Sequence, residues 1–168
     1  MTSRTAAIDF SFSQANTVRG LLKALAEGGW SEQEPMGVSY VVNSDGLFDW
    51  QWATRDRGDE VVALLDSSQA DAYDVGLCVY HALAETGGQL LLSPGRTECS
   101  FAPTINRRSI DDAFHFTDMS WYLGALVPRL IPLGLTGYEV CDRTPSWYDT
   151  TAPAALSPSA DPADPRSA

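Results

Sequence analysis

The stretch GVSYVVNSDGLFDWQWA, residues 37–53, contains two runs in which apolar and polar residues alternate, on either side of the dipeptide Asp45-Gly46. Asp-Gly is typical of tight turns, because Gly readily adopts the left-handed backbone conformation that these turns require. Alternation with a period of two is the pattern of a strand that buries one face. The stretch therefore predicts an antiparallel hairpin with strands over residues 37–43 and 47–53.

The second run of the hairpin places Phe48, Trp50 and Trp52 at every second position. These side chains would share one face of the strand, and the other face is mostly polar. A sheet with one apolar and one polar face is typically covered by helices on one side only. We therefore expect the aromatic row to face the core, and an exposed platform for a ligand is the alternative.

Hydrophobic periodicity predicts the remaining elements. Helical spacing predicts helices over residues 16–27, 68–86 and 118–131. Alternation predicts further strands over residues 6–12, 89–93, 97–102 and 136–142. Residues 59–66, DEVVALLD, fit either a short helix or a buried strand. These elements predict an α+β fold: a mainly antiparallel sheet of five or six strands, made of two hairpins and a C-terminal strand, with three helices packed on it.

The length and the distribution of apolar residues predict one domain and a tail. The chain has 168 residues, and its aromatic residues are spread over the first 148. Residues 1–148 are therefore expected to form a single α+β domain. Residues 149–168 are rich in Pro, Ala, Ser and Asp, and they are expected to form a disordered tail.

Acidic residues dominate the charge of the chain. Twenty-two Asp and Glu stand against 11 Lys and Arg, which gives a net charge of −11. Between Glu27 and Glu85 there are twelve acids and two arginines, a local charge of −10. Such a field repels nucleic acid and anionic membranes and attracts basic partners, although it could also serve solubility alone. We expect a basic protein partner, with no nucleic acid and no membrane.

The sequence also bears on the compartment of the protein and on metal binding. Nowhere do about 18 apolar residues follow one another, and the start of the chain does not resemble a signal peptide. Three cysteines without a CxxC pair are unsuited to a disulfide framework, so we expect a cytoplasmic protein. Cys78 and His81 would lie on adjacent turns of the helix predicted over residues 68–86. The other possible ligands are distant in sequence, so neither a metal nor another cofactor is expected.

The connection over residues 103–116 is the best place in the chain for catalytic chemistry. It brings a histidine, a carboxylate and two guanidinium groups together in sequence, namely Arg107, Arg108, Asp111 and His115. Asp111 could orient His115 as a general base if the segment were helical. The chain has neither an evident nucleophile nor a phosphate-binding or metalloprotease motif. A binding function is therefore favoured, and a small enzyme or ligand-binding domain that uses this connection is the alternative.

The favoured hypothesis is an acidic domain that neutralises another protein by occluding it. Bacterial immunity proteins, which inhibit toxins, share this size, charge and fold class, but no sequence motif connects this chain to one of their families. The expected contact residues are the acids Asp45, Asp49, Asp56, Asp59, Glu60 and Asp66. Trp50 or Trp52 would anchor the partner if either side chain is exposed.

Overall fold

The computed structural model describes residues 5–112 and 116–143. In these ranges the strands are β1 (Thr5–Phe12), β2 (Trp30–Ser31), β3 (Val38–Val42), β4 (Gln51–Ala53), β5 (Val75–His81), β6 (Thr86–Leu92), β7 (Glu98–Ile105) and β8 (Leu135–Arg143). The α-helices are α1 (Val18–Ala26), α2 (Gly58–Leu65) and α3 (Met119–Leu130). Among the residues described, no helix is long and apolar enough to cross a membrane. The tail predicted over residues 149–168 lies outside the described residues.

All the strands belong to one antiparallel sheet. The strand order is β4-β3-β5-β6-β7-β1-β8, and the short β2 pairs with β5. The predicted α+β class, with an antiparallel sheet and three helices, is confirmed. The predicted number of five or six strands is wrong, because the described part of the chain forms eight. The two additional strands are β2, which has only two residues, and β5, which the periodicity placed in a helix.

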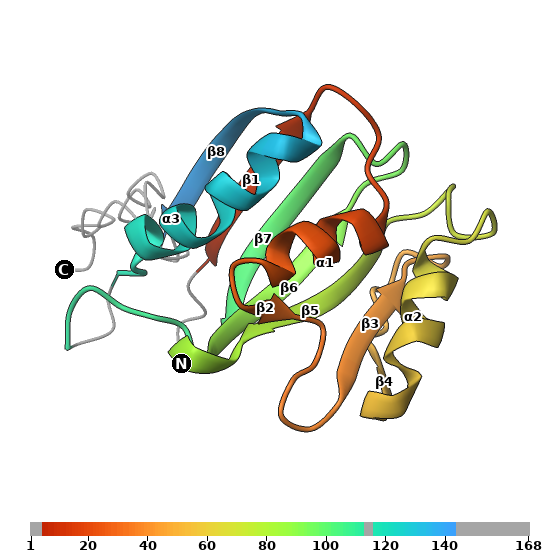
Figure 1. Ribbon diagram of the computed structural model, residues 1–168, viewed down its shortest axis with the longest axis horizontal. Helices are drawn as coiled ribbons and strands as arrows, with labels where there is room; N and C mark the ends of the chain where they lie inside the picture. Colours follow the sequence, from red (N-terminus) through yellow and green to blue (C-terminus); the bar gives the residue numbers. More distant parts are fainter. Residues whose placement is uncertain (1–4, 113–115, 144–168) are drawn as a thin grey trace, which may run out of the picture.

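The three α-helices pack on one face of this sheet (Figure 1). The register shows which strand residues share that face, because directly paired residues project to the same side. Ile8, Phe10 and Phe12 of β1 alternate toward the helices, and Phe101 of β7 pairs with Ile8. These side chains form one core with the buried stripes of the helices. We call the opposite side of the sheet, which none of these three helices covers, the open face.

Helix α1 follows its predicted apolar stripe, with Val18, Leu21, Leu22 and Leu25 buried. The capping residue is Thr17, whose side chain accepts a hydrogen bond from the Gly20 N–H. Asn16 begins the helix predicted over residues 16–27 but lies before α1, and its side-chain amide donates to the carbonyls of Gln14 and Leu133. After the helix, Gly29 has φ +87°, the left-handed conformation expected at a helix stop.

The helix predicted over residues 68–86 does not form. Val75–His81 is β5, a strand between β3 and β6. Its first five residues are buried without alternation, because a central strand can be covered on both faces. A continuous apolar run of this kind mimics a helical stripe. The ambiguous residues 59–66 provide the helix instead, since α2 spans Gly58–Leu65.

The pairing of β6 with β7 is interrupted by a β-bulge. Gly87 pairs with Ile105 and Gln89 with Ala102, so two residues of β7 stand opposite Gly88. One of these two is Pro103, which has no N–H for the ladder, and a bulge is one of the few places where an inner strand tolerates proline. A side chain at Gly88 would clash with the Ala102 carbonyl. Gly88 of β6 and Pro103 of β7 thus lie opposite each other at the bulge.

Arg96 is a buried cation that ties the turn before β7 to the loop before β5. Its guanidinium donates to the carbonyls of Ala70 at 2.8 Å and Tyr73 at 2.9 Å. It also donates to the carbonyls of Leu92 and Ser93, at the end of β6. The side chain therefore gives hydrogen-bond donors to four backbone acceptors in a buried setting, where an unpaired acceptor is costly.

Candidate interaction surface

The aromatic row of the hairpin does not face the core. Val38 pairs with Ala53, and Ser39 pairs with Trp52. Val38 and Ala53 are both buried on the side of the helices. Trp52 is the neighbour of Ala53 in β4, so its side chain projects to the open face. Trp52 is 57% exposed and Phe48 is 41% exposed. The prediction that this row packs in the core is therefore wrong for both residues.

Trp50 and Trp52 are nevertheless held in place by glycines. A Cβ atom added to Gly37 would lie 2.6 Å from Cε2 and Nε1 of Trp52, so the indole packs directly against the backbone. A Cβ atom added to Gly76 in β5 would lie 3.1 Å from Cη2 of Trp50, so this ring reaches across β3. Trp50 is half-buried. The two indoles thus have defined positions on the open face.

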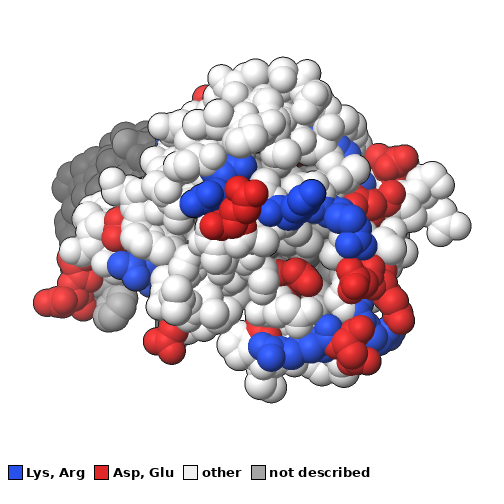
Figure 2. All heavy atoms as spheres, viewed as in Figure 1, with Lys and Arg blue, Asp and Glu red and all other residues white. Residues whose placement is uncertain are grey.

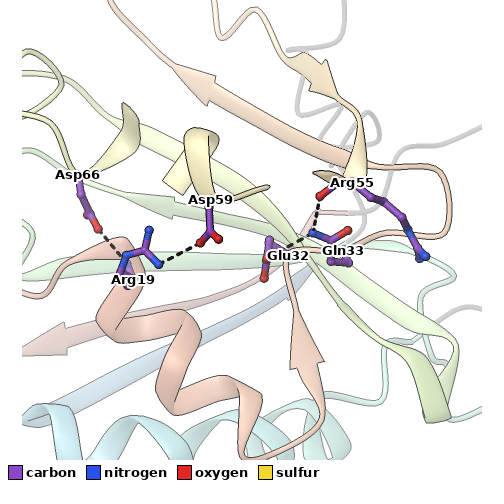
Figure 3. Close-up of polar contacts among 6 residues, drawn as sticks. All are labelled: Arg19, Glu32, Gln33, Arg55, Asp59 and Asp66. Carbon is purple, nitrogen blue, oxygen red and sulfur yellow. Dashed lines mark hydrogen bonds and ion pairs between the residues drawn. The ribbon is translucent and has the colours of Figure 1, made fainter. Parts of the chain in front are cut away.

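Polar contacts brace the segment before β3 against the segment after β4 (Figure 3). The Gln33 side chain donates to the Arg55 carbonyl at 3.2 Å. The Arg55 guanidinium in turn donates to the Glu34 carbonyl at 3.2 and 3.3 Å. These reciprocal bonds hold the chain on either side of Gly37 and Trp52, so Trp52 is preorganised for contact with a partner.

The connection between β3 and β4 is longer than the tight turn that Asp45-Gly46 predicts. Asp45 Oδ1 accepts a hydrogen bond from the Leu47 N–H, and Asn43 Oδ1 accepts one from the Phe48 N–H, both at 3.0 Å. Phe48 has φ +52°, a strained conformation for a residue with a side chain. The exposed apolar residues of the hairpin region, which we call the hairpin patch, are Met36, Leu47, Phe48 and Trp52.

The structure divides the six predicted contact acids into two groups. Asp59 forms an ion pair with Arg19 at 3.1 Å (Figure 3), and Glu60 forms one with Arg57 at 2.9 Å. On the face that carries the helices, acids and bases lie side by side rather than in one acidic field (Figure 2). Asp59 and Glu60 are therefore partly neutralised within the protein itself.

Asp66 has a structural role. One carboxylate oxygen accepts a hydrogen bond from the Val18 N–H at 2.7 Å. The other accepts one from the Arg19 N–H at 3.0 Å (Figure 3). These N–H groups belong to the first turn of α1, where the helix leaves donors without intrahelical partners and where negative charge is favourable. Asp66 thus fixes the end of α2 to the start of α1.

Replacing Asp66 with asparagine is expected to lower the free energy of unfolding by about 1 kcal/mol, because the amide has one acceptor oxygen and no charge. Urea denaturation of the full chain measures the difference. Asp71→Asn is the matched control, since Asp71 is exposed, and its effect should be within about 0.5 kcal/mol of zero. Equal stability of the two variants would contradict the capping role.

Asp45, Asp49 and Asp56 form the second group, and all three are exposed around the hairpin. A hydrogen bond from the Thr54 side chain, helped by a backbone hydrogen bond and by the charge of Arg57, lowers the pKa of Asp56. Its carboxylate is therefore ionised at neutral pH. Asp45 and Asp49 flank Leu47 and Phe48 in the sequence, and Asp56 follows Trp52 by four residues. We call these acids and the hairpin patch together the hairpin surface.

Sequence analysis missed a second acidic site on the open face. Asp9 of β1 pairs with Glu139 of β8, and Ser11 pairs with Glu98 of β7. With their neighbours, these residues line a groove of about 530 Å³. The alternation of Asp9 with Ile8 and Phe10 is visible in the sequence, but the sequence does not show which of the predicted strands pair with this one. The groove lies five strand intervals from β4, roughly 24 Å at 4.8 Å per interval.

The described members of the candidate catalytic group have separate contacts. Arg107 donates to the Thr117 hydroxyl at 2.8 Å, and Asp111 accepts from the Phe116 N–H at 3.3 Å. Arg108 instead lies over the ring of Trp121 in α3. The described part of residues 103–116 contains no helix that could align an acid with a base. His115 lies outside the described residues.

Cys78 and His81 do not form a pair of metal ligands. They belong to β5 rather than to a helix, and at an odd spacing their side chains project to opposite faces. His81 packs edge-on against Trp30 and Trp121. Cys78 is buried on the open face, and this burial raises the pKa of its thiol to about 12. Within residues 5–112 and 116–143, no group of three potential ligands could hold a metal ion.

Searches of protein-family models, curated proteins and solved structures found no match to this chain. Its function is therefore inferred from the geometry of the surfaces described above.

Proposed function

We propose that the protein binds a basic protein through its open face, with Trp52 as the anchor, and that it inhibits this partner by occlusion. A toxin-like protein with a basic active site is the partner that fits best. The observation that carries the proposal is the indole of Trp52, which is exposed although it packs against Gly37. Aromatic side chains held rigidly at a surface are typical anchors of protein interfaces.

The charges around Trp52 support a basic partner. The hairpin region that carries the hairpin patch also carries the exposed acids Asp45, Asp49 and Asp56. The groove with Asp9 lies on the open face, as Trp52 does. An interface of standard size buries about 800 Å² on each partner, and a surface that extends roughly 24 Å between the two sites can supply this area. Carboxylates on this face would take the place of the phosphates that a basic active site recognises.

The test compares two variants that lose the same amount of charge. One carries Asp45→Asn, Asp49→Asn and Asp56→Asn, and the control carries Asp71→Asn, Glu85→Gln and Asp112→Asn at exposed positions outside the hairpin. The partner is first isolated from the source organism on the immobilised full chain. The hairpin variant should then associate with it about tenfold more slowly at low salt, with a smaller change in dissociation, because exposed charges act mainly on the encounter.

The control variant should associate much closer to the wild-type rate, since its charges lie outside the contact surface. Equal association rates of the hairpin variant and the control would overturn the role of these acids. The isolated partner is also expressed in cells with and without the chain. If the chain does not relieve the effect of the partner on growth or on its own enzymatic activity, the inhibitor function is wrong even if the two proteins bind.

A further inference from the structure

A cleft of about 590 Å³ lies on the side of the molecule that carries the helices, where α3 passes the end of β5. It is lined by Arg108, Arg129, His81, Ser120 and Trp121, together with small apolar residues. This volume is within the range of sites that bind small molecules, about 300–1,000 Å³. Among the described residues, those that line the cleft include no Asp or Glu, although the protein as a whole is acidic.

Within the part of the chain that the structure describes, the Arg108 side chain has a ring contact but its Nε–H has no acceptor. Its guanidinium carbon lies 4.6 Å from the ring centroid of Trp121, and its Nε atom is buried without a hydrogen-bond partner. A buried donor without an acceptor is costly and calls for an explanation. The cation–π contact fixes the plane of the guanidinium but satisfies none of its N–H groups.

The backbone beneath Arg108 is firmly anchored. The Arg108 N–H donates to the hydroxyl of Tyr122 at 3.0 Å, and this hydroxyl also shares a hydrogen bond of 2.6 Å with Thr86. Tyr122 and Thr86 are fully buried, so they hold the backbone from which the Arg108 side chain extends in a fixed position. Arg108 is therefore preorganised at the edge of the cleft, which lowers the entropic cost of binding an acceptor.

The other polar side chains that line the cleft can also donate hydrogen bonds. Arg129 has only a loose contact with the exposed Glu27, at 3.7 Å, so its guanidinium can take up a second acceptor. His81 Nδ1 accepts a hydrogen bond from the Ala84 N–H at 3.2 Å, which places the hydrogen of the neutral ring on Nε2. Ser120 contributes a hydroxyl from the first turn of α3. Two arginines that line one cleft match the geometry and charge of an oxyanion.

We propose that this cleft binds a small organic anion, whose phosphate or carboxylate group is held by Arg108 and Arg129. The apolar part of the ligand lies along Leu83, Ala125 and Pro128, which line the same cleft. The proposal does not depend on the protein partner of the open face, because the cleft and the open face lie on opposite sides of the sheet. The protein thus carries a ligand site in addition to its interaction surface.

Nitrogen-15 NMR of the full chain tests the site. Inorganic phosphate and succinate are titrated separately at constant ionic strength, with chloride as the reference anion, and the Nε–H signals of Arg108 and Arg129 are followed. At least one of the two anions should produce saturable shifts with a Kd of about 1 mM. The anion that binds more tightly identifies the charged group of the ligand as phosphate or carboxylate.

Arg108→Gln and Arg129→Gln should each weaken this binding about tenfold, because each removes one guanidinium. Arg129→Gln keeps Arg108 on Trp121, so it tests the site even if Arg108→Gln disturbs local packing. Arg57→Gln is the matched control and should bind like the wild type, since Arg57 is exposed and pairs with Glu60. Shifts that stay linear with both anions, or equal affinity of all three variants and the wild type, would overturn the proposal.

Discussion

Replacing Arg96 with methionine is expected to lower the free energy of unfolding by about 3 kcal/mol. Methionine is also long and unbranched, but it provides none of the hydrogen bonds that Arg96 donates to the carbonyls of Ala70, Tyr73, Leu92 and Ser93. These acceptors would be left in a setting that water reaches poorly. The loop before β5 would lose its attachment to the end of β6.

Urea denaturation measures this loss, and Arg57→Met is the control. Arg57 makes one exposed ion pair with Glu60, and such pairs contribute about 0–1 kcal/mol. Arg96→Lys should lower the free energy of unfolding by an intermediate amount. The guanidinium uses two nitrogen atoms to reach these carbonyls, whereas lysine has a single ammonium group. A loss of less than about 1 kcal/mol for Arg96→Met would show that the four hydrogen bonds contribute little to stability.

Replacing Trp52 with alanine should weaken binding of the protein partner by about 30-fold or more, which corresponds to at least 2 kcal/mol. The loss should appear mainly as faster dissociation, because truncating an anchor removes contacts made within the complex. The stability of the free protein should change by less than about 1 kcal/mol, since more than half of this side chain is exposed. Surface plasmon resonance with the isolated partner measures both rate constants.

Leu83→Ala provides the control for Trp52→Ala. Leu83 is 94% exposed, and it lies after β5 rather than on the hairpin. Its truncation removes apolar surface without touching the open face, so the affinity should stay within about twofold of the wild type. Equal affinities of the Trp52 and Leu83 variants would exclude Trp52 as the anchor. The proposed anion site would be unaffected by this result, because it is tested with phosphate and succinate alone.

Elements with one buried face could be predicted from the sequence. Helix α1 shows the stripe from Val18 to Leu25, and β1 shows the alternation from Ile8 to Phe12. In each case solvent on the opposite side forces polar residues into the pattern, so the period is visible. The same reason explains the failure at β5, which is covered on both faces over its first five residues and therefore shows no period.

The candidate site could be predicted only in part, because side-chain partners come from distant parts of the chain. The exposed acids of the hairpin follow from their position in the sequence. Nothing near Asp66 indicates that it caps α1, since its partners, Val18 and Arg19, lie 48 and 47 residues away. The exposure of Trp52 depends likewise on the register of β4 against β3, which the Asp45-Gly46 dipeptide did not determine.

The position of β1 between β7 and β8 has a consequence for the order of events during synthesis. Of the strands of this sheet, β1 is synthesised before all the others, yet both of its neighbours are the last two. The interval from Phe12 to Glu98 takes roughly 4–17 s to translate at about 5–20 residues per second. Until β7 and β8 have been synthesised, Ile8, Phe10 and Phe12 lack the strands beside which they pack. Slower translation of residues 13–97 would lengthen the interval during which β1 lacks both of its neighbours in the sheet.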